Sequence, residues 1–453
     1  MLTLRPYQQE AVASVYEHLR TRDDNPCVVL PTGCHGAGHP ILMFDGTVSP
    51  VEEIRVGDQV MGPDSQPRQV RQLCRGEDEL FRITPRRGVS FVVNGDHILS
   101  LMSTNEGKQW NCSQKGGEIT NISVREYLTK SRSWKHLRKL YRVPIEFSNS
   151  TVLPLPPYIL GLLIGDGHIV DTIELTTADE SIASVWDSFV QSTGSRTIVR
   201  DHNNRCPTYR MITARGKYNI ITEILTELRL AGCRSDNKFI PHIYLTAARS
   251  DRLQLLAGLI DSDGSRHHSG FEITTASREL ATDIVFLCRS LGYSANCTSK
   301  YSCCQTGADG WYSRIHIDGH CQEVPCRLPR KRVDQRAQKK DPLRTGFSVE
   351  SCGRGQYFGF ELDDDHLYVD GHFIVHHNSG KTPVMATICR DAVKNWQGRV
   401  LILAHVKELL EQSAEKLRQV CPEVKFGIYS AGLKKRETKA PVIVAGIQSI
   451  YKR

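Results

Sequence analysis

The spacing of apolar residues changes several times along this chain. Residues 11–19 carry Ala, Val and Leu at helical spacing, and residues 27–30 form a short apolar run typical of a buried strand. From residue 34 to about residue 146, short apolar runs alternate with turn residues such as Asp45-Gly46, a pattern that predicts β-hairpins. A helical start is therefore followed by a long segment of short strands.

The middle of the chain contains an internal repeat. Residues 160–167 form an apolar stretch that ends in Asp-Gly, and an alternating strand follows at 173–178; residues 256–264 and 271–276 repeat this order and spacing. A helix that ends in an Asp-Gly turn would explain one copy. Two copies with matching strands favour a shared role for the two acids, Asp166 and Asp263.

The C-terminal part of the chain first shows the pattern of short strands again, and then a pattern of alternating strands and helices. Residues 356–378 read as short strands, and residues 383–392 as a helix with proline in its first turn. Apolar strands at 400–405 and 442–445 flank a further helical pattern at 410–417. Alternating strands and helices predict a parallel, doubly wound sheet.

The length and composition of the chain limit the number of domains and the class of protein that we expect. The length of 453 residues predicts about three domains, and no apolar run is long enough to span a bilayer. The 15 cysteines are scattered, and the group at 297–326 lacks the spacing of a zinc ribbon. We expect a monomer of the reducing cytoplasm that has no membrane partner.

The net charge of +8 is concentrated in residues 327–344. This stretch is either a solvated face or a stretch that contacts phosphate.

Two short segments far apart would together make one phosphate loop. Leu-Pro-Thr-Gly at 30–33 and Ser-Gly-Lys-Thr at 379–382 read continuously as such a loop. The loop needs its residues consecutive, because its backbone N–H groups curl around one phosphate chain and open into a helix. The intervening residues should therefore abolish ATP binding. They begin with a sulfur nucleophile, Cys34, and end with His377-Asn378, directly before the hydroxyl of Ser379.

This arrangement resembles an intein inserted in the Walker A loop of a superfamily 2 helicase-like ATPase of the DEAD/DEAH type. The resemblance implies that Cys34 attacks the carbonyl of Gly33, that Ser379 takes over the acyl group, and that Asn378 cyclises with help from His377. No cofactor is implied for splicing. Residues 34–150 and 346–378 resemble the two parts of the all-β, horseshoe-like Hint splicing domain.

Three further positions follow from the same resemblance. Asn94-Gly95-Asp96-His97 aligns with the intein motif Thr-x-x-His, so His97 would activate the scissile amide, and Asn94 replaces the threonine that hydrogen-bonds it. His366 stands at the first histidine position of the C-terminal blocks. Gly359 stands where many inteins carry an aspartate.

The repeat resembles the LAGLIDADG homing endonucleases, which implies an α+β domain at 151–345 with two αββαββα-type repeats at about 156–235 and 250–325. Asp166 and Asp263 would be the catalytic acids and would bind Mg²⁺. Lys238, in a Lys-x-Ile-Pro element, would stabilise phosphate charge or polarise the attacking water. Strands at 208–213 and 313–317 would form a saddle on double-stranded DNA at the intein-free host junction.

The flanks, residues 1–33 and 379–453, resemble parts of an α/β RecA-like helicase motor that would use ATP with Mg²⁺ on nucleic acid. The resemblance assigns adenine recognition to Gln8, and phosphate binding to Gly33, Ser379, Gly380, Lys381 and Thr382. Two rival functions remain open: the host ATPase or helicase after splicing, and an endonuclease whose splicing half has decayed. Intact junction residues favour splicing.

Overall fold

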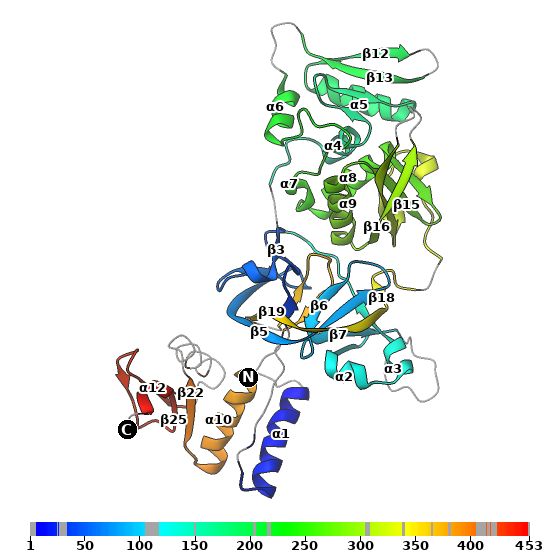
Figure 1. The fold of residues 1–453 in the computed structure, drawn as a ribbon. Coiled ribbons are helices and arrows are strands. Elements are labelled where there is room, and N and C mark those ends of the chain that lie inside the picture. The colour runs from blue at the N-terminus through cyan, green and yellow to red at the C-terminus, as the bar shows by residue number, and fades with distance from the viewer. Residues whose placement is uncertain are drawn as a thin grey trace. The chain divides into compact units, whose positions relative to one another are not determined.

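A computed structural model describes residues 6–24, 26, 34–104, 117–148, 151–202, 205–214, 219–303, 309–337, 340–363, 366–378, 382–404, 414, 417 and 424–451. The chain divides into two compact units, drawn together in Figure 1. One unit joins Met1–Thr32 with Ser379–Arg453, and the other is Gly33–Asn378. None of the described helices is both long and apolar enough to cross a lipid bilayer.

The first unit is built from both ends of the chain. Its helix α1 (Pro6–Thr21) contacts α10 (Thr382–Trp396): the Tyr16 hydroxyl donates to Asp391 Oδ2 at 2.8 Å, and its ring meets Trp396 edge-on. Strands β22 (Val400–Ala404), β25 (Val442–Gly446) and β23 (Phe426–Ser430) pair in parallel, and β24 (Lys435–Arg436) closes the edge. The predicted parallel pairing is present. The helix expected at 410–417 lies largely outside the described residues.

Residues 34–148 and 340–378 form two large sheets and the two-stranded sheet β2-β3 in the second unit. One has the strand order β19-β1-β6-β5-β4, the other β18-β9-β7-β21-β20 with β8 beside β7. We expected only short strands, but β5 and β19 pair with each other along almost their whole length. The bounds are β1 His35–Gly36, β2 Pro40–Leu42, β3 Val48–Pro50, β4 Gln59–Met61, β5 Pro67–Pro85, β6 Phe91–Asn94, β7 Ile98–Ser103, β8 Ile119–Ser123, β9 Arg138–Tyr141, β18 Arg344–Thr345, β19 Phe347–Leu362, β20 Leu367–Val369 and β21 Val375–His377.

This part also contains two short helices that the strand pattern did not predict. They are α2 (Val124–Thr129) and α3 (Arg132–His136). Ser123 and Ser131 cap them, since each hydroxyl accepts a backbone N–H from the first helical turn. Side-chain capping satisfies N–H groups that a helix start leaves open. The all-β prediction is therefore incomplete here.

The remaining part of the second unit contains two halves with the same element order. Their sheets run β10-β11-β13-β12 and β14-β15-β17-β16, and a helix precedes each pair of strands. The first half ends in α6, whereas the second ends in 3₁₀ turns at Cys321–Glu323 and Pro329–Lys331. The bounds are α4 Pro157–Ile164, β10 Gly167–His168, β11 Glu174–Thr176, α5 Glu180–Ser192, β12 Arg196–His202, β13 Arg205–Ile212, α6 Ile220–Glu227, α7 His242–Leu245, α8 Arg249–Ser262, β14 Gly264–His267, β15 Gly270–Thr275, α9 Arg278–Ser290, β16 Ser294–Cys303 and β17 Asp309–Asp318.

Helices α4 and α8 touch through glycine. A Cβ atom on Gly161 would lie 2.5 Å from the Leu255 carbonyl oxygen, and one on Gly258 would lie 2.2 Å from the Tyr158 carbonyl oxygen. Either distance is too short for a side chain, so the two backbones approach each other only because these residues have none. The close approach brings the C-terminal ends of α4 and α8, and the acids that follow them, together.

The proline-rich stretch at 154–157 packs against the core: Leu155 is buried, its N–H donates to the Tyr244 hydroxyl, and its carbonyl accepts from that hydroxyl. One sequence interpretation needs correction, because the basic stretch at 327–344 is not uniformly solvated. Lys331 is buried, and Arg330 and Arg336 pair with Asp179 and Asp318.

Candidate functional sites

The backbone amide before Cys34 is held by Asn94. The Cys34 N–H donates to Asn94 Oδ1 at 3.1 Å, and the Asn94 N–H donates to the Cys34 carbonyl at 3.1 Å. Strand β1 follows Cys34 and pairs with β6, which ends at Asn94. Cys34 is 1% exposed. Asn94 therefore holds the N–H of the amide that splicing would break and the carbonyl of the next peptide bond, in a buried environment.

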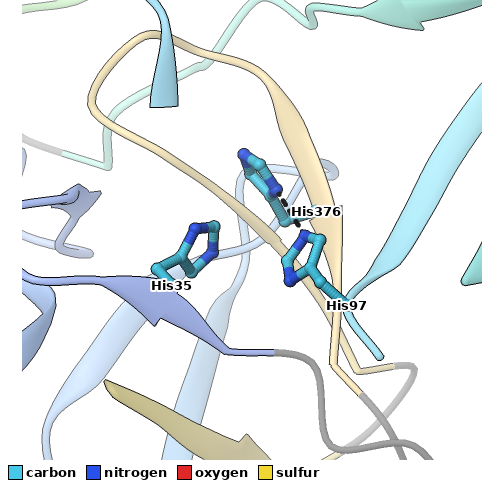
Figure 2. Close-up of side chains that lie close together, drawn as sticks. All are labelled: His35, His97 and His376. Carbon is cyan, nitrogen blue, oxygen red and sulfur yellow. Dashed lines mark hydrogen bonds between the residues drawn. The ribbon is translucent and has the colours of Figure 1, made fainter. Parts of the chain in front are cut away.

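His97 lies in the turn after β6 and contacts a histidine from the far end of the unit. His97 Nε2 is 3.3 Å from His376 Nδ1, and His376 Nε2 is 3.2 Å from Asp370 Oδ2. Figure 2 shows the rings of His35, His97 and His376 facing one another, with a dashed line between His97 and His376. All four side chains are buried.

Burial sets the charge of this cluster. It lowers the pKa of His97 well below its usual value, and the nearby His376 lowers it further. Burial alone would raise the pKa of Asp370, but its hydrogen bond with His376 and the neighbouring imidazoles outweigh burial and lower it. Burial also lowers the pKa of His35 and of His39, so an ionised Asp370 lies in one cluster with neutral rings at His35, His39 and His97 at neutral pH.

The charge of Asp370 determines the tautomers along this chain of contacts. A carboxylate only accepts, so the tautomer of His376 that fits these contacts donates to Asp370 from Nε2 and accepts at Nδ1. His97 then donates from Nε2, which leaves the lone pair on His97 Nδ1. That nitrogen has no hydrogen-bond partner among the described residues. The Nδ1 atom of His97 can therefore accept a proton, as a base does.

The C-terminal end of residues 34–378 lies next to the turn that contains His97. In β21, His377 pairs with Ile98, the residue after His97. The Asn378 N–H donates to the His366 carbonyl at 2.7 Å, and His366 adopts a positive φ of 60°. His366 thus contacts Asn378 through its backbone. Gly33 and Ser379, the outer residues of the two junctions, lie outside the described residues.

Sequence reasoning missed His35, Asp370 and His376. His376 precedes the histidine that we chose, and the alternation of a strand places the two side chains on opposite faces. Asp370 followed by glycine reads only as a turn. Gly359, at the position expected for an acid, lies in β19 opposite Cys74. The buried carboxylate of this site comes instead from Asp370.

In the repeated part, Asp166 and Asp263 directly follow the paired helices. Burial, and then the nearby Asp263, raise the pKa of Asp166 to about 7; burial also raises the pKa of Asp263. Both acids remain accessible to solvent, and two like charges held close together are stabilised by a proton or a cation. The two carboxyls therefore suit a divalent metal ion.

Lys238 has a counterpart that the sequence did not reveal. Its Nζ donates to the carbonyls of Leu163, Gly165 and Gly167, at the end of α4. Lys331 Nζ donates to three carbonyls at the end of α8, those of Ile260, Asp261 and Ser262. Burial lowers the pKa of Lys238 to about 8 and also lowers the pKa of Lys331. Each acid thus has one lysine next to its helix end.

The strands expected to form a saddle carry matched polar side chains. In the first half Glu174 Oε1 is 3.4 Å from Arg210 Nε, and in the second Glu272 Oε1 is 3.1 Å from Arg314 Nε. The hairpin of β16 and β17 also exposes Tyr301 and Trp311, whose rings pack edge to face. These sheets present hydrogen-bonding groups of the kind that read a DNA groove.

The predicted nucleotide-binding residues are mostly beyond what the structure describes. Gly33, Ser379, Gly380 and Lys381 lie outside the described residues. Thr382 begins α10, and Gln8 lies in α1, but neither side chain is described.

Comparison with known proteins identifies three segments. Residues 34–151 match the family of homing-endonuclease-associated Hint domains, residues 239–310 match the homing endonuclease family, and residues 370–453 match the family of type III restriction enzyme res subunits. The chain therefore combines an intein-type Hint domain with a homing endonuclease domain. Both families are catalytic, so the chain is an enzyme.

Similar proteins cover only parts of this chain. An iron–sulfur cluster assembly SufBD family protein of Mycobacterium tuberculosis is 30% identical over 32% of the chain and 18% of its own length. The replicative DNA helicase DnaB of Mycobacterium intracellulare is 31% identical over 32% of the chain and 20% of its own length. The ATP-dependent DNA helicase Hel308 of Thermococcus kodakarensis is 26% identical over 51% of the chain and 22% of its own length. The chain thus spans less than a quarter of each of these relatives.

Solved structures add little. A structure of the homing endonuclease I-DmoI has 13% identity and a TM-score of 0.27, and covers 36% of this chain and 88% of its own. The gp41-1 intein has 16% identity and a TM-score of 0.17, and covers 24% of this chain and 68% of its own. Similarity at this level carries no weight by itself.

Proposed function

We propose that residues 34–378 are a self-splicing intein that joins Gly33 to Ser379, and that residues 151–345 within it are a site-specific homing endonuclease. One observation carries the splicing proposal. The amide of Cys34 is bonded to Asn94, and β21, which ends one residue before Asn378, pairs with Ile98, so both ends of the segment meet at one buried turn.

The first step uses the free lone pair of His97. His97 Nδ1 takes the proton of the Cys34 thiol, and the sulfur attacks the carbonyl carbon of Gly33. The bond from that carbon to the Cys34 nitrogen breaks, and His97 returns the proton to this nitrogen. Asn94 keeps the amide oriented throughout. The Asp370–His376 pair holds His97 in the tautomer that can accept the proton.

The later steps use the other end. The Ser379 hydroxyl attacks the thioester carbonyl and releases the Cys34 thiol, which forms a branched ester. The Asn378 side-chain nitrogen then attacks the Asn378 carbonyl and releases Ser379, with His377 donating a proton. The freed amine of Ser379 attacks its own ester, and a normal Gly33–Ser379 peptide bond results.

The endonuclease would act on double-stranded DNA at the intein-free host junction. Asp166 and Asp263 would hold Mg²⁺, which when bound stabilises charge on the phosphodiester and lowers the pKa of water. Lys238 and Lys331 would stabilise negative charge beside each acid. Both halves are supplied by one chain, so a monomer suffices.

A second candidate function belongs to the spliced flanks. The two flanks pack as one unit through α1 and α10, and residues 370–453 match the res subunit family. We propose that ligation restores a phosphate loop for ATP and Mg²⁺ in an intracellular, nucleic-acid-dependent motor. Hel308, a partial relative, is an ATP-dependent DNA helicase.

Mass spectrometry of the expressed chain tests splicing. We expect free residues 34–378 and a ligated product whose peptides span Gly33–Ser379. In Asn378→Ala, dithiothreitol should release residues 1–33, because the thioester still forms; Cys34→Ala should not respond to thiol. Persistence of intact precursor under reducing conditions, or identical behaviour of both variants, would contradict the scheme.

A further inference from the structure

The turn that carries Asp370 is contacted by a helix of the endonuclease domain. Helix α9 contributes two residues spaced three apart, and this spacing places them on one face of the helix. The ring of Phe286 meets the ring of Phe373 edge-on, with centroids 5.0 Å apart. Arg289 Nη1 is 3.4 Å from His372 Nδ1. The endonuclease domain therefore packs on the turn that supplies the buried carboxylate.

The two oxygens of the Asp370 carboxylate make different contacts. Oδ1 accepts the backbone N–H groups of His372 at 2.9 Å and of Ile374 at 2.8 Å, and these bonds close the turn. Oδ2 is the atom that lies 3.2 Å from His376 Nε2. A shift of the turn at His372 would therefore also redirect Oδ2, and with it the contact on which the tautomers of His376 and His97 depend.

Two buried arginines hold His372. Arg142, directly after β9 of the Hint domain, donates from Nε to the His372 carbonyl at 3.1 Å, and Arg289 lies against the ring. An arginine only donates, so this contact fits a neutral His372 whose lone pair is on Nδ1. Burial lowers the pKa of His372, and the two arginines oppose the raising effect of Asp370. One arginine from each domain thus fixes the same residue of the turn.

Arg289 is itself fixed and buried. Its Nε and Nη2 donate to the Ala295 carbonyl at 3.2 and 3.0 Å, and the residue is 4% exposed. Burial, and then the nearby Arg142, lower the pKa of Arg289 to about 10, whereas Asp370 acts in the opposite direction. A buried guanidinium is costly unless an opposite charge lies nearby. The charge of Asp370 in the Hint domain thus favours the charge of Arg289 in the endonuclease domain.

We propose that Arg289 is a positioning residue for splicing, and that the endonuclease domain completes the splicing site by holding the Asp370 turn. Arg289 acts through His372 and Asp370, which orient His376 and thereby the base His97. This inference rests on the proposed splicing function. It gives the endonuclease domain a second task besides DNA cleavage, because α9 supports the first step of excision.

Arg252 allows positioning to be separated from simple docking of the two domains. It lies in α8, is buried, and donates to the carbonyls of Ala247 and Ile145 at 2.8 Å each. These contacts join the endonuclease domain to residues 145–147 of the chain. Loss of docking should affect Arg252→Met and Arg289→Met equally, whereas loss of positioning should affect only Arg289→Met.

Thiol-induced release of residues 1–33 from the Asn378→Ala chain measures the first step. We expect Arg289→Met to slow this release by about tenfold or more, because a small misplacement of a catalytic group has effects of this size. Arg289→Lys, which keeps the charge and a donor, should recover part of the rate, and Arg252→Met should stay close to the reference. A rate unchanged by Arg289→Met, or an equal loss in Arg252→Met, would overturn the proposal. Absence of release from the Asn378→Ala chain itself would instead contradict the proposed splicing function.

The tautomer of His376 provides a measurement that a general loss of stability would not change. In the unspliced Cys34→Ala, Asn378→Ala chain, ¹⁵N spectra should show His376 with its proton on Nε2, as the contact with the carboxylate requires. Arg289→Met should shift these signals towards a mixture of both tautomers, Arg289→Lys should restore them, and Arg252→Met should leave them unchanged. Unchanged His376 signals in Arg289→Met would overturn the proposal even if release is slower.

His372→Phe tests the same contact if Arg289→Met does not fold. His372 is only half-buried, and phenylalanine keeps a ring there while removing the acceptor for Arg289. We expect the same slower release and the same mixture of His376 tautomers as in Arg289→Met. A normal rate and an unchanged tautomer in His372→Phe would show that the arginine does not act through this ring, and would overturn the proposal.

Discussion

Lys238 and Lys331 make the same contacts in the two halves of the endonuclease domain, although the sequence around them differs. Each ammonium donates to three carbonyls at the end of one of the paired helices, and each is buried. The Lys-x-Ile-Pro element marks only Lys238. The two lysines are therefore related in the same way as the two acids, with one lysine at the end of each paired helix.

Replacing Lys331 should impair cleavage as much as replacing Lys238. We expect Lys331→Met and Lys238→Met each to reduce plasmid cleavage at least tenfold, with more nicked product, because one of two strand-cutting centres loses a positive charge. DNA affinity should change little, since most of it comes from phosphate contacts elsewhere. Lys340→Met is the exposed control. Normal double-strand cutting by Lys331→Met would remove this residue from the mechanism.

The raised pKa of Asp166 should affect both the pH dependence of DNA cleavage and the stability of the domain. With a pKa of about 7, Asp166 is protonated below neutral pH, so Mg²⁺-dependent cleavage should rise as pH increases through about 7. An acid whose pKa is raised on folding loses stability between its unfolded pKa and its folded one. Without metal, Asp166→Asn should therefore stabilise the domain at pH 8 by only about 1 kcal/mol, because solvent screens an exposed carboxylate, and should have less effect at pH 4.

Thermal unfolding at both pH values measures this effect, and Asp171→Asn, at a fully exposed acid, is the control. Cutting of the intein-free junction by Asp166→Asn at the wild-type rate would exclude the acid from the metal site. Equal stabilisation at both pH values would show that burial does not raise its pKa.

Asn94 should contribute to N-terminal activation. We expect Asn94→Ala to slow thiol-induced release of residues 1–33 about fivefold in the Asn378→Ala background, because one hydrogen bond to the scissile amide is worth about 1 kcal/mol. Asn94→Thr should restore part of the rate, and Asn121→Ala in β8 is a control. An unchanged rate in Asn94→Ala would show that the amide is oriented by other groups.

Gly258 should be required for the packing of α4 on α8. A methyl group there would meet the Tyr158 carbonyl at 2.2 Å, so Gly258→Ala should destabilise the domain by at least about 2 kcal/mol. It should also reduce cleavage, because the acids follow these helices. Urea unfolding gives the measurement. Gly310→Ala in β17, where the nearest atom lies 3.6 Å away, should have little effect.

Features that depend on neighbouring residues could be predicted from the amino-acid sequence. The split phosphate loop and the proposed splicing residues Cys34, Asn378 and Ser379 are recognisable because they stand next to one another at the two junctions. The two Asp-Gly copies are recognisable because helix, acid and strands follow one another directly. Hairpins and helices were predictable in outline, because the spacing of apolar residues and the positions of turn residues reflect local backbone structure.

Contacts between residues far apart in the sequence became visible only in the folded chain. His97 and His376 are 279 positions apart, and no local pattern links either of them to Asp370. Lys331 looked like part of a solvated basic stretch because the sequence does not show that its chain turns inward to the end of α8. Charge and tautomer also depend on burial and on partners, which arise only when both sheets have closed around the site.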